Sequence, residues 1–185
     1  KEAEISGKGT YLFGFEESYG CLAGTYARDK DAVVACMLVA EMALYYKEKG
    51  LSLYDQLQNI YKKYGFFKEG IQTMTLKGAD GVAQIQAIMD GFRANPPKKL
   101  GAYDVVSFRD YKKDTVLDLA TGKVTPTGLP NSNVLYFDLT DDAWVCVRPS
   151  GTEPKIKFYI GVKGTDNADA DAKLRALTDA LMALA

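Results

Sequence analysis

The stretch WVCVRPSGTEPKIKFYIGV, residues 144–162, consists of two apolar segments on either side of a polar loop. The first segment covers residues 144–147 and the second covers residues 156–162. Short segments rich in valine, isoleucine and aromatic residues, bounded by proline and glycine, are typical of β-strands. We therefore predict two strands, joined by a loop that is longer and more polar than a tight turn requires.

The loop between these strands carries groups that suit an anion. The guanidinium of Arg148 can bind a phosphate through two parallel hydrogen bonds, and the hydroxyls of Ser150 and Thr152 can donate to it. Gly151 allows the backbone to turn its N–H groups toward the same anion. The residue types in this loop are those of a phosphate-binding site.

Charged residues at the end of the loop leave two interpretations open. Lys155 or Lys157 can add a second positive charge, because strand alternation allows both side chains to lie on one face of a sheet. Alternatively, the loop is an ordinary hairpin connection in which Arg148 pairs with Glu153. The chemistry of the loop alone favours neither interpretation.

Two further loops carry clustered charges. In GFEESYG, residues 14–20, Glu16 and Ser18 lie between glycines after an apolar strand. The two adjacent carboxylates of this motif can accept hydrogen bonds from sugar hydroxyls, coordinate a metal or act in acid–base catalysis. Alternatively, the motif is a solvated turn with ordinary surface carboxylates. In RDKDA, residues 28–32, Asp29 or Asp31 is a candidate N-cap for the helix that follows. Lys30 in the same motif is a candidate phosphate ligand or acid–base group.

Hydrophobic periodicity outside these loops predicts an α+β fold. The first 65 residues form a strand, a loop and two helices in this prediction, and the rest form an antiparallel sheet with a helix near each end. Apolar stripes on the first two helices predict that both pack into a core. Residues 118–132 are predicted to be a loop. The predicted helices cover about 32–49, 52–64, 79–95 and 166–185, and the remaining predicted strands cover 9–15, 66–76, 102–109 and 133–139.

The composition excludes several classes of function. The 185 residues include 23 basic and 24 acidic ones and carry a net charge of −1, so the positive charge of a nucleic-acid-binding protein is absent. The lack of histidine excludes mechanisms that need an imidazole. Three cysteines match no zinc or redox spacing. With no signal peptide and no membrane-spanning segment, we expect a cytoplasmic protein, and the start at Lys1 suggests a piece of a longer polypeptide.

Taken together, the motifs GFEESYG, RDKDA and RPSGTEPKIKFY resemble the C-terminal part of the α-D-phosphohexomutases, the phosphoglucomutase/phosphomannomutase superfamily. The resemblance covers the whole chain and includes the order and separation of the motifs. It implies that residues 1–66 are the end of a sugar-binding α/β layer domain, the third of four. It also implies that residues 67–185 are a fourth, phosphate-binding domain with an antiparallel sheet like that of the TATA-box-binding protein (TBP).

The resemblance assigns roles to individual residues. In the family pattern, Glu16 and Ser18 would bind the 3- and 4-hydroxyls of the sugar. Lys30 matches a family lysine that faces the reacting centre, which makes it the catalytic candidate of this chain. The phosphate that is not transferred would be bound by Arg148, Ser150, Gly151 and Thr152, with Lys157 in a place where relatives often carry a phosphate-binding arginine.

The resemblance also implies a reaction and its cofactors. The family moves a phosphoryl group between O1 and O6 of a hexose through a phosphoserine, with Mg²⁺ at the phosphoserine and glucose 1,6-bisphosphate as the bisphosphorylated intermediate. This sequence contains neither the phosphoserine loop nor the Asp-Gly-Asp metal loop of the family. We therefore expect the chain to bind substrate without turning it over, and we expect no metal ligands within it.

The expected partners are a phosphorylated hexose and the N-terminal domains of the same polypeptide, with no nucleic acid and no membrane. The motif EESYG favours a phosphoglucomutase, which interconverts glucose 1-phosphate and glucose 6-phosphate. A phosphomannomutase and a phosphopentomutase are the enzymatic alternatives. Outside enzymes, the alternatives are a non-catalytic phosphosugar-binding module and a purely structural domain whose loop cations are paired internally.

Overall fold

The computed structural model describes residues 5–16, 20–76, 80–151 and 153–185. The chain divides into two compact units, Lys1–Ile60 and Tyr61–Ala185, which are described separately below. The domain boundary between residues 66 and 67 stays a prediction. No helix among the described residues is long and apolar enough to cross a membrane.

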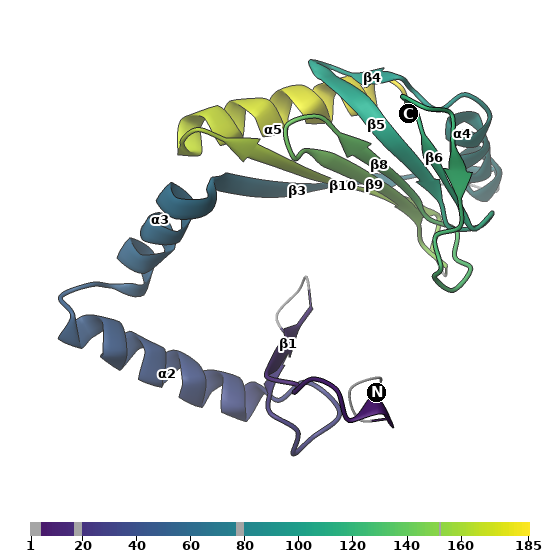
Figure 1. The fold of residues 1–185 in the computed structure, drawn as a ribbon. Helices are drawn as coiled ribbons and strands as arrows, with labels where there is room; N and C mark the ends of the chain where they lie inside the picture. Colours follow the sequence, from purple (N-terminus) through teal and green to yellow (C-terminus); the bar gives the residue numbers. More distant parts are fainter. Residues whose placement is uncertain (1–4, 17–19, 77–79, 152) are drawn as a thin grey trace. The chain divides into compact units, whose positions relative to one another are not determined.

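Unit 1, Lys1–Ile60, contains a small hairpin followed by helices (Figure 1). Strands β1 (Phe13–Phe15) and β2 (Cys21–Ala23) pair in antiparallel fashion, with Phe15 opposite Cys21. Helix α2 (Ala32–Glu48) follows, and α3 (Leu53–Tyr64) runs from unit 1 into unit 2. The predicted strand over residues 9–15 is therefore confirmed only in its last three residues.

Local capping explains where both helices begin. The Asp31 carboxylate accepts hydrogen bonds from the backbone N–H groups of Val33 and Val34, so the predicted aspartate N-cap of α2 is confirmed. At the start of α3, the Asp55 N–H donates to the Ser52 hydroxyl oxygen, and the Ser52 N–H donates back to the Asp55 carboxylate. This reciprocal pair satisfies two N–H groups that the helix itself leaves without partners.

The prediction that α2 and α3 pack into a core is wrong for the described residues. Neither helix contains a buried residue, and Val33 is 80% exposed while Met37 is 53% exposed. A helix that is apolar on all sides is usually buried in a larger structure. Unit 1 supplies only a two-stranded sheet, which is too small to cover such a helix.

Unit 2, Tyr61–Ala185, is built on one antiparallel sheet. Its strand order is β3-β10-β9-β8-β5-β6-β7, with β4 paired to the other end of β5. The apolar segments of residues 144–162 form β9 and β10, as predicted, and lie side by side in the middle of this order. The strands are β3 (Phe66–Thr75), β4 (Lys99–Leu100), β5 (Tyr103–Asp110), β6 (Thr115–Asp118), β7 (Val124–Thr125), β8 (Leu135–Leu139), β9 (Trp144–Pro149) and β10 (Lys155–Gly164).

Helices α4 (Gly81–Ala94) and α5 (Asn167–Met182) cover one face of this sheet, which leaves the other face open (Figure 1). The covered face is the core: Val145, Val147, Ile156 and Phe158 are fully buried. Alternate residues of the same strands point to the open face. The predicted α+β class, with a helix near each end of the antiparallel sheet, is confirmed.

Two strands at one edge of the sheet were not predicted: β6 ends at the first residue of the predicted loop over residues 118–132, and β7 lies within it. Strand β6 pairs with β5, and the two-residue strand β7 pairs with β6. Both are short and lie among turn residues, so neither shows the alternation by which a strand is recognised. A register shift between Val105 and Ser107 in β5 also escaped prediction, and it brings both Val105 and Phe108 into the core.

A buried ion pair joins α4 to the sheet. The Arg93 guanidinium, 6% exposed, donates from Nε to the Asp110 carboxylate, 2% exposed, at 3.2 Å. A second guanidinium nitrogen donates to the side-chain oxygen of Asn133. Removing one partner of such a pair leaves a buried charge without compensation.

We expect the substitution Arg93→Met to lower the free energy of unfolding by about 3–5 kcal/mol, because it leaves the Asp110 carboxylate buried and unpaired. Urea denaturation followed by circular dichroism measures the change. Lys99→Met is the matched control, because Lys99 pairs with Asp104 at 3.6 Å on the surface and such pairs contribute little. Equal effects of the two substitutions would show that burial does not determine how much the Arg93–Asp110 pair contributes to the free energy of unfolding.

Candidate functional site

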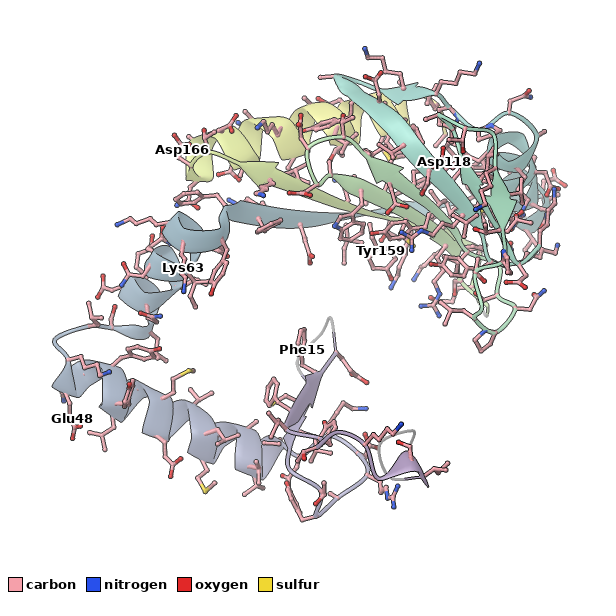
Figure 2. The ribbon with its side chains drawn as sticks, in the orientation of Figure 1. Phe15, Glu48, Lys63, Asp118, Tyr159 and Asp166 are labelled. Atoms are coloured by element: carbon pink, nitrogen blue, oxygen red, sulfur yellow. The ribbon has the colours of Figure 1, made fainter. Side chains whose placement is uncertain are left out.

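The open face of the unit 2 sheet holds two cations directly opposite each other. Arg148 on β9 and Lys157 on β10 are register partners, and both are exposed. Lys155 lies two residues before Lys157, and Ile156 between them is fully buried on the other face. The predicted placement of Lys155 and Lys157 on one face is therefore confirmed. Figure 2 shows side chains, including the labelled Tyr159, on the side of the sheet away from α5.

Backbone hydrogen bonds organise the loop between β9 and β10. The Ser150 N–H donates to the Lys155 carbonyl at 2.8 Å, and the Lys155 N–H donates to the Glu153 carbonyl at 2.7 Å. The Glu153 N–H donates to the Ser150 hydroxyl oxygen at 3.3 Å, which orients that hydroxyl. These bonds join Ser150, Glu153 and Lys155 at the two ends of the loop.

The charges in the loop do not pair as the hairpin interpretation predicts. Glu153 forms an ion pair with Lys155 at 3.1 Å rather than with Arg148. Within the described ranges of the chain, Arg148 makes no ion pair. Arg148 and Lys157 therefore leave the face beside the loop positively charged.

Glycine at position 151 has no packing reason among the described residues. A Cβ atom built on Gly151 has no heavy atom within 4 Å, and the backbone does not have the positive φ that favours glycine. The close approach of a ligand to the backbone is a common reason for a glycine at such a position. Thr152 lies outside the described residues.

The pKa of the Cys146 thiol depends on the charge of this face. It lies two residues before Arg148 on β9, and its register partners are Tyr159 on β10 and Tyr136 on β8. Burial raises the pKa of the Cys146 thiol to about 11, and the positive charge of Arg148 partly offsets this effect. Any anion that neutralises Arg148 will therefore raise the pKa of Cys146 further.

An aromatic layer lies next to these cations on the same face. A Cβ atom on Gly161 would come within 2.2 Å of the Trp144 indole nitrogen, so the indole lies against the backbone of its register partner. Tyr136 stacks on Trp144 with ring centroids 5.7 Å apart. Arg109 lies 5.0 Å from the centre of the Tyr136 ring and binds Asp138 through two nitrogens. Sequence reasoning missed this layer, although a glycine inside an apolar strand signals such a close approach.

The acidic loop of unit 1 contains a second polar cluster. The Glu16 N–H donates to the Gly20 carbonyl at 2.9 Å and closes the loop that follows β1, whose last residue, Phe15, is labelled in Figure 2. The Lys30 ammonium lies 2.9 Å from Glu16 Oε1 and 2.9 Å from Asp29 Oδ1. The hydrogen bonds that the ammonium donates to Asp29, first, and to Glu16, second, raise the pKa of Lys30, so the amine stays charged.

The structure thus brings together two of the residues predicted in unit 1, Glu16 and Lys30, and four of those predicted in unit 2, because Gly151 lies in the same loop as Ser150. Glu16 and Lys30 are in direct contact, which the sequence did not indicate. Arg148, Ser150 and Lys157 lie on or beside one loop. Ser18 lies outside the described residues. No group of three or more histidine, cysteine, aspartate or glutamate side chains that could hold a metal occurs in the described part of the chain.

Comparisons with known proteins match both units to one family. The family model described as "Phosphoglucomutase/phosphomannomutase, alpha/beta/alpha domain III" matches residues 3–64. The model described as "Phosphoglucomutase/phosphomannomutase, C-terminal domain" matches residues 44–177. The two matches follow the same order in the sequence as the two polar loops.

Curated relatives include phosphoglucomutases of Staphylococcus aureus. Those of strains MRSA252 and USA300 are each 38% identical to this chain over 166 residues, which is 90% of the chain and 30% of the relative. A solved structure of the Paramecium exocytosis-sensitive phosphoprotein pp63/parafusin, a phosphoglucomutase in its open form, has a TM-score of 0.49 and 13% identity and covers 90% of the chain. The chain spans about 30% of the length of these curated relatives.

We expect inorganic phosphate to slow the alkylation of Cys146 by iodoacetamide at pH 8.5 by about two- to fivefold. The thiolate is the reactive form, and neutralisation of Arg148 lowers the thiolate fraction. Mass spectrometry measures the rate at each cysteine, with exposed Cys36 as a reference in the same sample and sodium chloride matching the ionic strength. An equal change at both cysteines, or none at Cys146, would contradict anion binding at Arg148.

Proposed function

Because the chain belongs to the phosphoglucomutase/phosphomannomutase family, we propose that it supplies the sugar-binding and phosphate-binding parts of a phosphohexomutase. The substrate pair is glucose 1-phosphate and glucose 6-phosphate, in line with the phosphoglucomutases among its relatives. Unit 1 carries the proposed sugar-binding groups, and unit 2 carries the proposed phosphate-binding groups. Phosphoryl transfer itself uses residues that this sequence does not contain.

The observation that carries the proposal is the arrangement of cations beside the β9–β10 loop. Arg148 and Lys157 lie opposite each other on the adjacent strands β9 and β10. The carboxylate of the loop, Glu153, forms its ion pair with Lys155. A phosphate dianion relieves the repulsion between the two cations and accepts a bidentate pair from the guanidinium. The Ser150 hydroxyl and the N–H of Gly151 are further donors in the same loop, and Thr152 completes the motif.

Unit 1 supplies recognition of the sugar. The backbone N–H of Glu16 donates to the Gly20 carbonyl, and the Glu16 carboxylate forms an ion pair with Lys30. A carboxylate accepts hydrogen bonds from two neighbouring hydroxyls at once, which suits the 3- and 4-hydroxyls of a hexose. Ser18 adds a hydroxyl in the same motif, and the raised pKa of Lys30 keeps its amine charged beside the Glu16 carboxylate.

Binding of the phosphate that is not transferred contributes to catalysis at a distance. Its binding energy can be used to orient the sugar and to exclude water from the reacting phosphoryl group. This role needs a rigid and strongly basic loop rather than a nucleophile or a metal. The cations beside the β9–β10 loop, Arg148 and Lys157, lie on strands of a sheet and support this role.

The proposal places the remaining chemistry in other parts of a longer polypeptide. There a phosphoserine would supply the phosphoryl group, a Mg²⁺ ion would supply stabilisation of its charge, and glucose 1,6-bisphosphate would be the bisphosphorylated sugar. The residues described here offer no metal cluster, so no step of the reaction is assigned to a metal held by this chain. The proposal extends to a cytoplasmic location and to a TBP-like fold for residues 67–185.

The substitution Arg148→Ala tests the proposal. We expect it to weaken the binding of glucose 6-phosphate by about 2–3 kcal/mol, or roughly 30- to 160-fold in Kd, because a charge-assisted fork is lost. Isothermal titration calorimetry measures the change. Arg175→Ala removes the same charge from the exposed surface of α5 and serves as the matched control. Equal losses in both variants, or an unchanged Kd for Arg148→Ala, would refute the phosphate site.

A further inference from the structure

The side chain of Lys30 passes over the α-carbon of Gly20. A Cβ atom built on Gly20 would lie 2.1 Å from Lys30 Cδ and 2.8 Å from Lys30 Cγ, far inside any real contact distance. It would also lie 3.2 Å from Glu16 Oε2. The methylene groups of Lys30 therefore fill the space that a side chain at position 20 would occupy, and the Lys30 ammonium contacts the Glu16 carboxylate.

Several contacts bring the two segments into this position. The Asp31 N–H donates to the Cys21 carbonyl at 3.0 Å, which places the start of α2 beside β2. The Glu16 N–H donates to the Gly20 carbonyl, so the carboxylate and the glycine lie across the same loop. From this position the Lys30 ammonium reaches Glu16 Oε1 at 2.9 Å. The contact joins residues that are 14 positions apart, through a gap that only glycine leaves open.

We propose that Gly20 is a positioning residue, whose missing side chain lets Lys30 reach Glu16 and hold its carboxylate toward the sugar hydroxyls. The inference rests on the proposed function of this loop and extends it to a residue that contacts no ligand. Lys30 then has two tasks: its ammonium orients the acceptor for the sugar, and its stem fills the space above Gly20.

The backbone at Gly20 does not itself require glycine. Its φ lies outside the positive range that side chains avoid, so alanine fits the local conformation. The atoms that alanine would displace belong to a flexible, half-exposed lysine, whose side chain is 44% exposed. We therefore expect Gly20→Ala to turn Lys30 away from Glu16 while the hairpin and α2 remain folded.

The first test needs no ligand. In the full natural protein, acetylation by N-hydroxysuccinimide acetate is followed by mass spectrometry at Lys30, with exposed Lys62 as an internal reference. We expect Gly20→Ala to raise the rate at Lys30 at least twofold, because the amine loses one of its two carboxylate partners. Gly91→Ala is the control, since a Cβ atom there meets no heavy atom within 4 Å. An unchanged rate at Lys30 would overturn the inference.

The second test is a double-substitution cycle on ligand binding. We expect Gly20→Ala and Lys30→Ala each to weaken glucose 6-phosphate binding three- to tenfold and to leave inorganic phosphate binding unchanged. Glu16→Gln should do the same. In the Lys30→Ala background, Gly20→Ala should have no further effect, because the displaced atoms are gone. Additive losses would show that Gly20 acts independently of Lys30 and would overturn the inference.

The two tests separate the inference from the function on which it rests. If the unsubstituted protein binds inorganic phosphate but no hexose phosphate, the proposed sugar site is wrong, and the acetylation rates still decide whether Gly20 positions Lys30. If acetylation at Lys30 accelerates but the affinity for hexose phosphate does not change, the contact is real and its role in sugar binding is overturned.

Discussion

The register between β9 and β10 is the constraint on which the candidate phosphate site depends. It sets Arg148 opposite Lys157, although like charges facing each other across two strands are unfavourable by a few tenths of a kcal/mol to about 1 kcal/mol. The same register buries Val147, Ile156 and Phe158 completely on the other face, and full burial of such side chains is worth about 1.5–3 kcal/mol each. Hydrophobic burial therefore holds two cations together, and an anion is the natural ligand for them.

In unit 1 the corresponding constraint is space rather than register. Gly20 leaves a gap, the Lys30 stem fills it, and the ammonium meets Glu16 at the start of the loop. The arrangement uses half-exposed charges, which contribute little to stability and can exchange partners with a ligand. The two units thus present polar groups in different ways, one on a rigid sheet face and one on a short loop.

Much of the fold followed from local pattern. The β9 and β10 strands, the Asp31 cap and the face shared by Lys155 and Lys157 are all set by near neighbours in sequence, and the structure confirms them. The contact between Glu16 and Lys30 could not be predicted, because nothing in either segment shows that β2 lies beside the start of α2. The layer of Trp144 on Gly161 was missed although a glycine inside an apolar strand signals such a close approach.

The burial of α2 was predicted wrongly because its composition shows that an apolar surface exists, not which residues cover it. Val33 and Met37 are exposed in the described structure. Hydrophobic periodicity identifies the apolar face of a helix but does not identify the residues that cover it.

The claim that the β9–β10 loop binds phosphate is tested most directly by an amide chemical-shift titration of the chain with glucose 1,6-bisphosphate, with free glucose as the control. If the loop binds phosphate, we expect the bisphosphate to shift the amide resonances of Arg148, Ser150, Gly151 and Lys157, and free glucose to leave them unchanged. The absence of shifts at these four amides at millimolar bisphosphate would contradict the account.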